Sequence, residues 1–245
     1  MESKPVIQFE CISKYFGSLT ALRDIELDVK AGEIVAVVGH NGSGKSTLLR
    51  IVSGLTQPDK GALKIDGRIV QLGSVRAARR CGIELLSQEP ALFPHLSVVE
   101  NICVGTETTV QLLGLRFLRK REMLSRAQNL SKRFGISKHT LTNPVSRLSH
   151  GQQALVGFMR SLNGSPRLLA LDEPAAALGY GERSTVNRII ANLAMEGTAI
   201  LLVTHILKDV IDLSHRLAIL NEGNLVYFGP TQDFTETEIV RHLVA

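Results

Sequence analysis

A glycine-rich turn between an apolar run and a helix-like segment constrains this chain more than any other feature. Residues 39–47 read Gly-His-Asn-Gly-Ser-Gly-Lys-Ser-Thr. Gly39, the four residues after it and the Gly-Lys-Ser that begins at Gly44 match the phosphate-binding loop pattern. Glycines let successive backbone N–H groups turn inward around a phosphate, and the following helix points its positive dipole end at the same anion. The pattern predicts a nucleotide site, and an incidental glycine turn is the less favoured alternative.

Every position of this loop is a candidate nucleotide ligand. Lys45 is expected to reach the β and γ phosphates as a point charge, and the Ser46 hydroxyl is expected to ligate Mg²⁺. The other positions contribute mainly backbone N–H groups to the cradle. The candidate ATP-binding residues of the loop are Gly39, His40, Asn41, Gly42, Ser43, Gly44, Lys45, Ser46 and Thr47.

Length and composition indicate an ordinary globular protein. The chain has 245 residues, of which 44% are hydrophobic and 21% charged, enough for one large core. It contains no apolar stretch of the roughly 20 residues that a membrane-spanning helix needs, and its first residues lack the layout of a secretory signal. Cys11, Cys81 and Cys103 form no Cys-x-x-Cys pair. We therefore expect a reducing cytoplasm rather than a disulfide framework or a zinc site.

The net charge of +5 is compatible with a polyanionic partner or an anionic membrane surface. Much of the excess lies between Arg116 and Arg133, where basic residues alternate with apolar residues such as Leu118 and Met123 at helical spacing. A solvated helix face is the favoured interpretation, and a dedicated polyanion site is the alternative.

The pattern along the chain predicts an α/β core with a helical insert. Residues 6–12 and 25–30 alternate in the manner of strands, whereas residues 168–171 and 199–203 are continuous apolar runs typical of strands covered on both faces. Residues 98–162 follow a mostly helical period and contain few strand-like runs. Shorter patterns predict hairpins at 62–67 and 216–228 and helices at 183–195 and 208–214.

Two adjacent carboxylates follow the apolar run 168–171. If that strand emerges beside the phosphate-binding loop, Asp172 is placed to hold the Mg²⁺ shell and Glu173 to act as the catalytic base. An acidic pair is also a common solubilising strand end. The loop upstream makes the catalytic interpretation the stronger one.

Residues 147–153 read Arg-Leu-Ser-His-Gly-Gln-Gln and precede an amphipathic helical pattern. Ser149 and Gly151 offer a hydroxyl and free backbone N–H groups, a second anion site, although a plain serine N-cap would look the same. Leu-Ser-x-Gly-Gln ahead of the acidic strand resembles the signature motif of the ATP-binding cassette (ABC) family. The resemblance implies that Ser149, Gly151 and Gln152 contact ATP.

Other positions match the family in order and spacing across nearly the whole chain. Gln88 resembles the glutamine that touches Mg²⁺ or its water, so the implied metal ligands are Ser46, Gln88 and Asp172. His205 resembles the switch histidine that contacts the γ phosphate. Phe16 resembles the aromatic that stacks on adenine, with Tyr15 as the reserve candidate. Taken singly, Gln88, His205 and Phe16 have ordinary structural explanations.

The resemblance also implies architecture and assembly. It implies an α/β fold with a P-loop NTPase core, a mixed sheet, an N-terminal antiparallel β subdomain and an inserted α-helical subdomain. Residues 1–245 would form a single ABC ATPase domain with the insert at approximately 98–162. Two cassettes pair head to tail in the family, so the implied state is a homodimer or a paired cassette, with each ATP between one phosphate-binding loop and the partner's signature motif.

Further stretches resemble the ribose, xylose and fructose import ATPases. They are residues 82–89, 96–102, 152–153 and 235–241. The resemblance implies an ATPase at the cytoplasmic face of the membrane that binds transmembrane permease subunits and, through them, a sugar-binding protein. It implies no nucleic-acid partner. Gly179 stands where most family members carry an interface aspartate, which leaves a regulatory or non-transport cassette with weak hydrolysis as the alternative.

Overall fold

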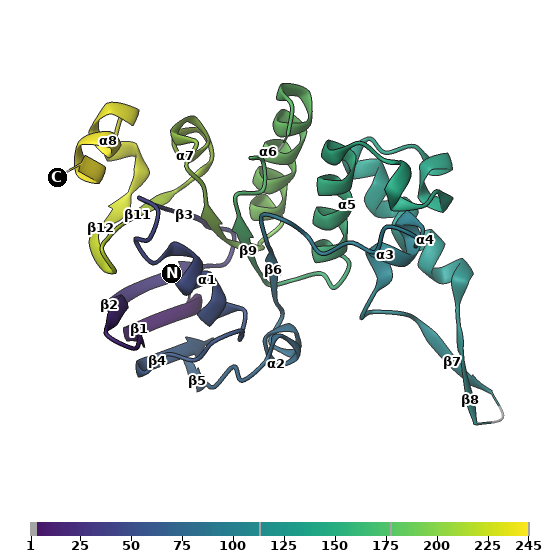
Figure 1. Cartoon of the computed structure of the whole chain (residues 1–245), viewed down its shortest axis with the longest axis horizontal. Coiled ribbons are helices and arrows are strands. Elements are labelled where there is room, and N and C mark those ends of the chain that lie inside the picture. The colour runs from purple at the N-terminus through teal and green to yellow at the C-terminus, as the bar shows by residue number, and fades with distance from the viewer. Residues whose placement is uncertain (1–3, 113, 177, 245) are drawn as a thin grey trace. The chain divides into compact units, whose positions relative to one another are not determined.

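The computed structural model describes residues 4–112, 114–176 and 178–244 (Figure 1). Within these residues the chain forms two compact units. The first unit takes its residues from Met1–Leu85, Arg167–Glu173 and Ile190–Ala245. The second takes its residues from Leu86–Pro166 and Pro174–Ile189. The predicted helical insert, 98–162, falls within the second unit, and the assignment of one domain to residues 1–245 stays a prediction.

Ten strands form the two larger sheets. They are β1 Pro5–Phe16, β2 Leu19–Lys30, β3 Ile34–Gly39, β4 Lys60–Ile65, β5 Arg68–Val70, β6 Ile83–Leu86, β9 Leu168–Asp172, β10 Ala199–Val203, β11 Arg216–Asn221 and β12 Asn224–Pro230. The helices that follow these strands are α1 Lys45–Val52, α2 Val75–Arg80, α6 Tyr180–Met195, α7 Leu207–Leu213, the short η3 Thr231–Asp233 and α8 Glu236–Val244.

The two sheets differ in strand direction. The N-terminal sheet has the order β2-β1-β4-β5 and is antiparallel throughout. The central sheet has the order β12-β11-β3-β10-β9-β6, in which β3 runs parallel to β10 and β11, whereas β11 and β12 are antiparallel. The central sheet is therefore mixed. The predicted fold class is confirmed, as are the hairpins β4–β5 and β11–β12.

Strand β3 is apolar along its length because both of its faces are covered. Val35 and Val37 belong to a core that also contains the buried side of α1 and the inner face of the N-terminal sheet. Ala36 and Val38 point to the opposite side and pack with Val210 of α7 and other buried residues of α7, α8 and β11. A strand buried on two faces cannot alternate in polarity. This packing fixes the strand that leads into the glycine-rich loop.

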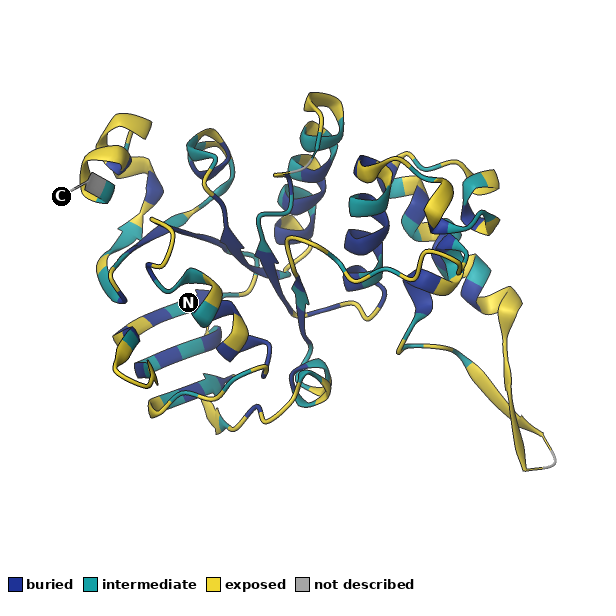
Figure 2. Cartoon of the chain, in the orientation of Figure 1, coloured by how far each residue is buried: buried dark blue, intermediate teal, exposed yellow. Residues whose placement is uncertain are grey.

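The second unit contains the helices α3 Val98–Cys103, α4 Lys120–Phe134 and α5 His150–Leu162 and the short turns η1 Lys138–Thr142 and η2 Val145–Arg147. Phe134 and Phe158 meet edge to face with ring centroids 5.5 Å apart. The side chain of buried Asn101 accepts a hydrogen bond from Phe93 N at 2.8 Å and donates to the Phe93 carbonyl at 3.0 Å, which closes the loop before α3. Figure 2 shows that each helix has one buried and one exposed side.

Residues 98–162 are mostly helical, as expected, but they include two short strands that the sequence pattern did not locate. Strands β7 Thr109–Leu112 and β8 Leu115–Leu118 form a separate two-stranded hairpin. Apolar and polar residues alternate along β7 and along the first three residues of β8. Gly114, between the two strands, has a φ of +80°. The basic residues after Leu115 were assigned to one helix face, but Arg116 lies on β8 and α4 begins only at Lys120.

A half-buried arginine joins the two sheets of the first unit. Arg216, at the start of β11, donates to Glu33 Oε2 at 2.8 Å and to Asp28 Oδ1 at 3.0 Å, and its guanidinium lies 4.4 Å from the centre of the Phe228 ring. Burial alone would lower the pKa of Arg216, but the hydrogen bonds to Glu33 and Asp28 outweigh it and raise that pKa. The guanidinium therefore stays charged between two carboxylates.

Replacing this arginine should destabilise the protein. Arg216→Leu leaves Asp28 and Glu33 without their shared cation, and we expect the free energy of unfolding to fall by about 2 kcal/mol, between the values for exposed and fully buried pairs. Urea unfolding followed by circular dichroism measures the change. The exposed Arg23→Leu is the matched control and should shift stability by less than about 0.5 kcal/mol. Equal effects of the two variants would contradict the prediction.

Candidate functional site

The glycine-rich loop lies between β3 and α1. Gly39 is the last residue of β3, Lys45 is the first of α1, and Gly44 between them is the N-cap, with a φ of +107° and no side-chain cap hydrogen bond. A Cβ at Gly44 would lie 2.5 Å from the Ala21 carbonyl oxygen and 2.6 Å from Leu22 Cδ2. Only glycine combines this backbone conformation with this close approach. The first backbone N–H groups of α1 therefore face an anion site that no side chain of the cap fills.

Lys45 is bound to the loop itself. Its Nζ donates to the carbonyl oxygens of Gly39 at 2.6 Å and His40 at 2.7 Å. Burial lowers the pKa of Lys45, while the charges of Glu173 and Asp172 act in the opposite direction. The ammonium is thus held inside the loop by two neutral acceptors and lies within electrostatic reach of two carboxylates. A phosphate would offer it a charged acceptor instead.

Asp172 and Glu173 stand where β9 ends, as predicted, but β9 is not the neighbour of β3. Strand β10 lies between them in the sheet. Burial, together with the charge of Glu173, raises the pKa of Asp172, against the effects of Lys45 and Arg50. Two like charges at the end of one strand favour binding of a cation there.

Glu173 is held in an uncommon backbone conformation by two contacts. Its φ is +49°, a left-handed value that few non-glycine residues adopt. Its N–H donates to the Val203 carbonyl oxygen of β10 at 2.9 Å. Its Oε2 lies 2.7 Å from Nδ1 of His205, within ion-pairing distance, with the carboxylate side chain 18% exposed and the histidine side chain 63% exposed. The structure therefore brings together Lys45, Asp172, Glu173 and His205 from three strand ends.

The remaining residues of the loop form a partly open cradle. His40, Asn41, Gly42 and Ser46 are exposed, and Thr47 is half-buried. The His40 ring lies 2.5 Å from the Leu243 carbonyl oxygen of α8, at hydrogen-bonding distance. Phe16 and Tyr15 at the end of β1 are 46% and 37% exposed, as a stacking surface requires.

The residues of this site fit a nucleotide with Mg²⁺. Ser43 Oγ is buried and has no hydrogen-bond partner, and open space surrounds the position of a Cβ at Gly42. Mg²⁺ is usually bound by one or two carboxylates together with waters and phosphate oxygens, not by a protein cage. No group of three or more His, Cys, Asp or Glu side chains able to hold a metal ion occurs among the described residues.

The signature segment begins helix α5 in the second unit. Ser149 is the N-cap: its hydroxyl accepts from Gln152 N at 3.2 Å, and Gln152 Oε1 accepts from Ser149 N at 3.2 Å, a reciprocal capping box. Ser149 and Gln152 are exposed, whereas Gly151 is buried. Gln88 is exposed and follows β6 by two residues. These four predicted site residues thus belong to a different unit from Lys45.

The sequence pattern alone predicts no role for Glu182, which lies in the same region. It belongs to the first turn of α6, and its Oε2 accepts a hydrogen bond from Gly179 N at 3.2 Å. The same carboxylate occupies the place that a Cβ on Gly151 would take. The sequence signal for this contact is the spacing. Glu182 lies three residues after Gly179, and a glutamate at that place can bond back to the N-cap backbone.

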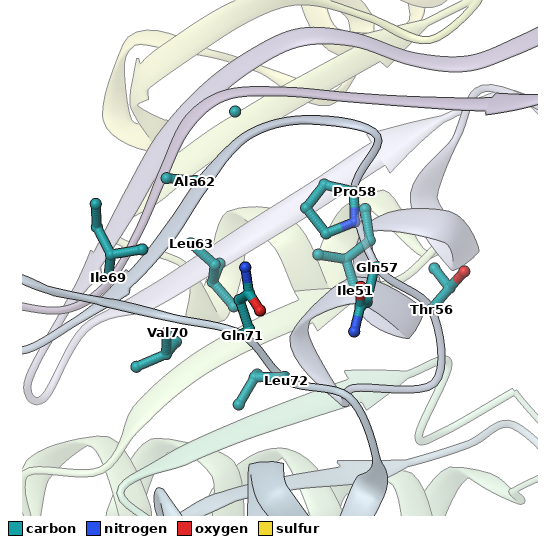
Figure 3. A pocket seen from close by; sticks show the side chains of 11 residues that line it. Ile51, Thr56, Gln57, Pro58, Ala62, Leu63, Ile69, Val70, Gln71 and Leu72 are labelled. Carbon is teal, nitrogen blue, oxygen red and sulfur yellow. The ribbon is translucent and has the colours of Figure 1, made fainter.

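A hollow of about 120 Å³ lies elsewhere in the first unit (Figure 3). Ile51 at the end of α1, Gln57 in the following loop and Leu63 of β4 line it together with neighbouring residues. None of its lining residues belongs to the loop 39–47 or to the cluster around Glu173. It is therefore separate from the candidate nucleotide site.

Comparison with known proteins identifies the family. Residues 22–176 match the sequence profile described as ABC transporter. The chain belongs to the ABC transporter family. This confirms the resemblance inferred from the motifs. None of the helices in the described residues has the length and apolar character needed to cross a membrane.

The relatives of this ABC cassette include import ATP-binding proteins. RbsA 2 of Streptomyces avermitilis, a ribose import ATP-binding protein, is 35% identical over 98% of this chain and 47% of the relative. RbsA 2 of Escherichia coli O157:H7 is 36% identical over 100% of this chain and 47% of the relative. The chain thus spans about half the length of the curated relatives it matches. Among solved structures it resembles cbiO1 from Clostridium perfringens, part of the ABC transporter complex cbiONQ, with a TM-score of 0.81, 27% identity and coverage of 98% and 94%.

The contact between Gly151 and Glu182 can be tested by a double-mutant cycle. Gly151→Ala displaces the Glu182 carboxylate from Gly179 N, and we expect it to cost about 1 kcal/mol, the worth of one hydrogen bond. In a Glu182→Ala background the same change should instead stabilise the protein by about 0.5–1 kcal/mol, because alanine is the better helix former. Urea unfolding of the four proteins gives the coupling energy. Additive effects would show that the carboxylate does not occupy this space in solution.

Proposed function

We propose that this chain binds and hydrolyses ATP as the nucleotide-binding subunit of a membrane importer. The observation that carries the proposal is the cluster formed by Lys45, Asp172, Glu173 and His205 at the ends of β3, β9 and β10. A cation in a glycine loop, a carboxylate for the metal and a second carboxylate in contact with a histidine are the groups that phosphoryl transfer to water needs.

The loop of residues 39–47 holds the triphosphate. Lys45 exchanges its bonds to the Gly39 and His40 carbonyls for bonds to the β and γ phosphates, while Ser43 and the first N–H groups of α1 donate to the same anion. Ser46 and Asp172, both in the first unit, would hold Mg²⁺, which would supply positive charge for the developing negative charge on the phosphate oxygens, and the family resemblance implies Gln88 as a further ligand. Phe16 stacks on adenine, with Tyr15 as the alternative.

Glu173 and His205 act on the attacking water. The Glu173 carboxylate accepts a proton from the water, and its contact with His205 Nδ1 fixes the direction of its oxygens. His205 is mostly exposed, so a γ phosphate can approach its ring while the contact with Glu173 is kept. The contact of Glu173 N with Val203 O keeps the strained backbone in place during this step.

A second cassette completes the site. Ser149, Gly151 and Gln152 begin α5 with a capped helix end whose N–H groups contact the nucleotide held by the partner, either a second copy or another cassette. ATP bridges the two halves, and loss of the γ phosphate weakens the contact, so closing and opening follow the difference in affinity for the two nucleotide states.

The transported compound is a monosaccharide. This part of the proposal is supported by the ribose import relatives, and it places the chain at the cytoplasmic face of the cell membrane as a peripheral subunit. Its partners are transmembrane permease subunits and, through them, a sugar-binding protein. A nucleic-acid partner is not part of the proposal.

Removal of the loop cation should abolish nucleotide binding. We expect Lys45→Ala to lower the affinity for ATP with Mg²⁺ by about a hundredfold or more, because charge-assisted bonds to the phosphates are lost. Isothermal titration calorimetry measures the affinity. The control is Lys208→Ala on α7, whose side chain is 71% exposed and pairs with Asp212. Unchanged binding by Lys45→Ala would refute the cradle.

Glu173→Gln should separate binding from hydrolysis. We expect it to keep the ATP affinity of the wild type and to lower kcat by about a thousandfold, as loss of a general base does. ATP should then trap a closed pair of cassettes, visible in light scattering as a doubled mass. The exposed Glu196→Gln is the matched control and should hydrolyse ATP at the wild-type rate.

The outcomes of this experiment distinguish the possible explanations. Wild-type phosphate release by Glu173→Gln would exclude Glu173 as the base. Loss of ATP binding in the same variant would assign the glutamate to the cradle instead. If the importer assignment is correct, the same substitution in the producing cell should also stop uptake of the labelled monosaccharide.

A further inference from the structure

The β7–β8 hairpin carries an apolar face that is exposed to solvent in the second unit. Directly paired residues of an antiparallel ladder point to the same side, and the register pairs Val110 with Phe117 and Leu112 with Leu115. These four residues form one wholly apolar face, on which their exposed fractions are 38%, 48%, 60% and 63%. Figure 2 shows the hairpin exposed along both strands. The exposure increases toward the tip.

Two hydrogen bonds anchor the base of this hairpin. Arg119 N donates to the Thr108 carbonyl at 2.8 Å, and Arg126 Nη1 donates to the Thr108 hydroxyl at 3.1 Å. Within the second unit the strands leave the helices α3 and α4 and project beyond them (Figure 1). A two-stranded hairpin alone is only marginally stable in water. An exposed apolar face on such a hairpin therefore indicates that another surface binds to it.

Basic residues lie on the opposite face of the hairpin and at its base. Arg116 lies on the opposite face of β8, and Arg119, Lys120 and Arg121 follow at the base, all of them exposed. Glu122 offsets only part of this charge, because it pairs with Arg119 at 3.4 Å and both side chains are about half exposed. An excess of positive charge beside an apolar ribbon complements an anionic surface with an apolar interior.

The dimensions agree with a bilayer surface. At a strand rise of about 3.3 Å per residue, Arg119 lies about 13 Å along the chain from Leu115. Amphipathic segments at membrane surfaces reach about 5–10 Å below the headgroups. Leu112 and Leu115 can therefore enter the acyl boundary while Arg119 and its neighbours stay among the phosphates.

We propose that the β7–β8 hairpin inserts its apolar tip into the surface of an anionic lipid bilayer, with the basic residues at its base bound to lipid phosphates. The hairpin thus binds membrane lipid directly. This contact requires neither ATP nor a permease, so a test of lipid binding does not depend on the proposed ATPase activity.

Vesicle flotation without nucleotide tests the proposal. The purified chain is mixed with vesicles of phosphatidylcholine alone or with about a third phosphatidylglycerol, at low and at high salt. We expect the chain to float with the anionic vesicles at low salt only. Leu115→Ser with Phe117→Ser should lower the partition coefficient by about tenfold or more, because the apolar face is lost. Lys120→Gln with Arg121→Gln should lower the binding to anionic vesicles and leave that to neutral vesicles unchanged.

A matched variant controls for the loss of apolar surface in general. Leu55 and Ile69 are exposed to a similar degree, 58% and 67%, and lie in the first unit. Leu55→Ser with Ile69→Ser should float like the wild type. Circular dichroism should show that all variants are folded, as expected for exposed positions.

Three results would overturn the proposal. The first is wild-type chain that does not float with anionic vesicles. The second is equal flotation with neutral and anionic vesicles. The third is equal flotation of wild type and Leu115→Ser with Phe117→Ser. If that double variant instead lowers the mass of the protein in light scattering while no protein floats, the hairpin face binds a second copy of the chain and not lipid.

Discussion

Two neighbouring backbone segments contact the glycine-rich loop, and the rest of the site depends on that confinement. The Ala21 carbonyl of β2 leaves no space beside Gly44. Next to it Gly223, in the turn between β11 and β12, donates its N–H to the Ser43 carbonyl at 3.1 Å. The N-terminal antiparallel sheet and the late hairpin thus shape the loop between β3 and α1. Because both contacts use backbone, they constrain the loop whatever side chains the neighbouring strands carry.

The charged side chains of the site balance one another mainly by lying close together, and less by direct ion pairs. Lys45 bonds to carbonyl oxygens, Glu173 contacts His205, and Asp172 carries a pKa raised by burial and by Glu173. Each of these groups gains a better partner when a polyanion and a divalent cation arrive together. The left-handed backbone of Glu173 is a further cost that the contact with Val203 offsets. The arrangement is that of a site organised in advance for a charged ligand.

Much of this could be predicted from the sequence. The loop between β3 and α1 and the hairpin β11–β12 follow from patterns within a few residues of one another, whereas the mixed sheet is implied by the family resemblance. The position of β10 between β3 and β9 could not, because the order of strands in a sheet is set by packing over long separations. The hairpin β7–β8 was missed because its apolar residues also fit a helical period. The candidate site was predicted at the level of residues, and the grouping of Lys45 with Glu173 agrees with it, but the roles of these residues stay predictions.

The support of the loop by Gly223 has a consequence for protein synthesis. The ribosome makes residues 39–47 long before residues 216–223, which supply β11 and the turn that contacts Ser43. During translation β3 therefore lacks both of its sheet neighbours until β10 is made, and the loop lacks its contact with Gly223 until 176 residues beyond Thr47 have been added (223 − 47 = 176). A nascent chain of this protein completes its nucleotide cradle only after the C-terminal hairpin has left the exit tunnel.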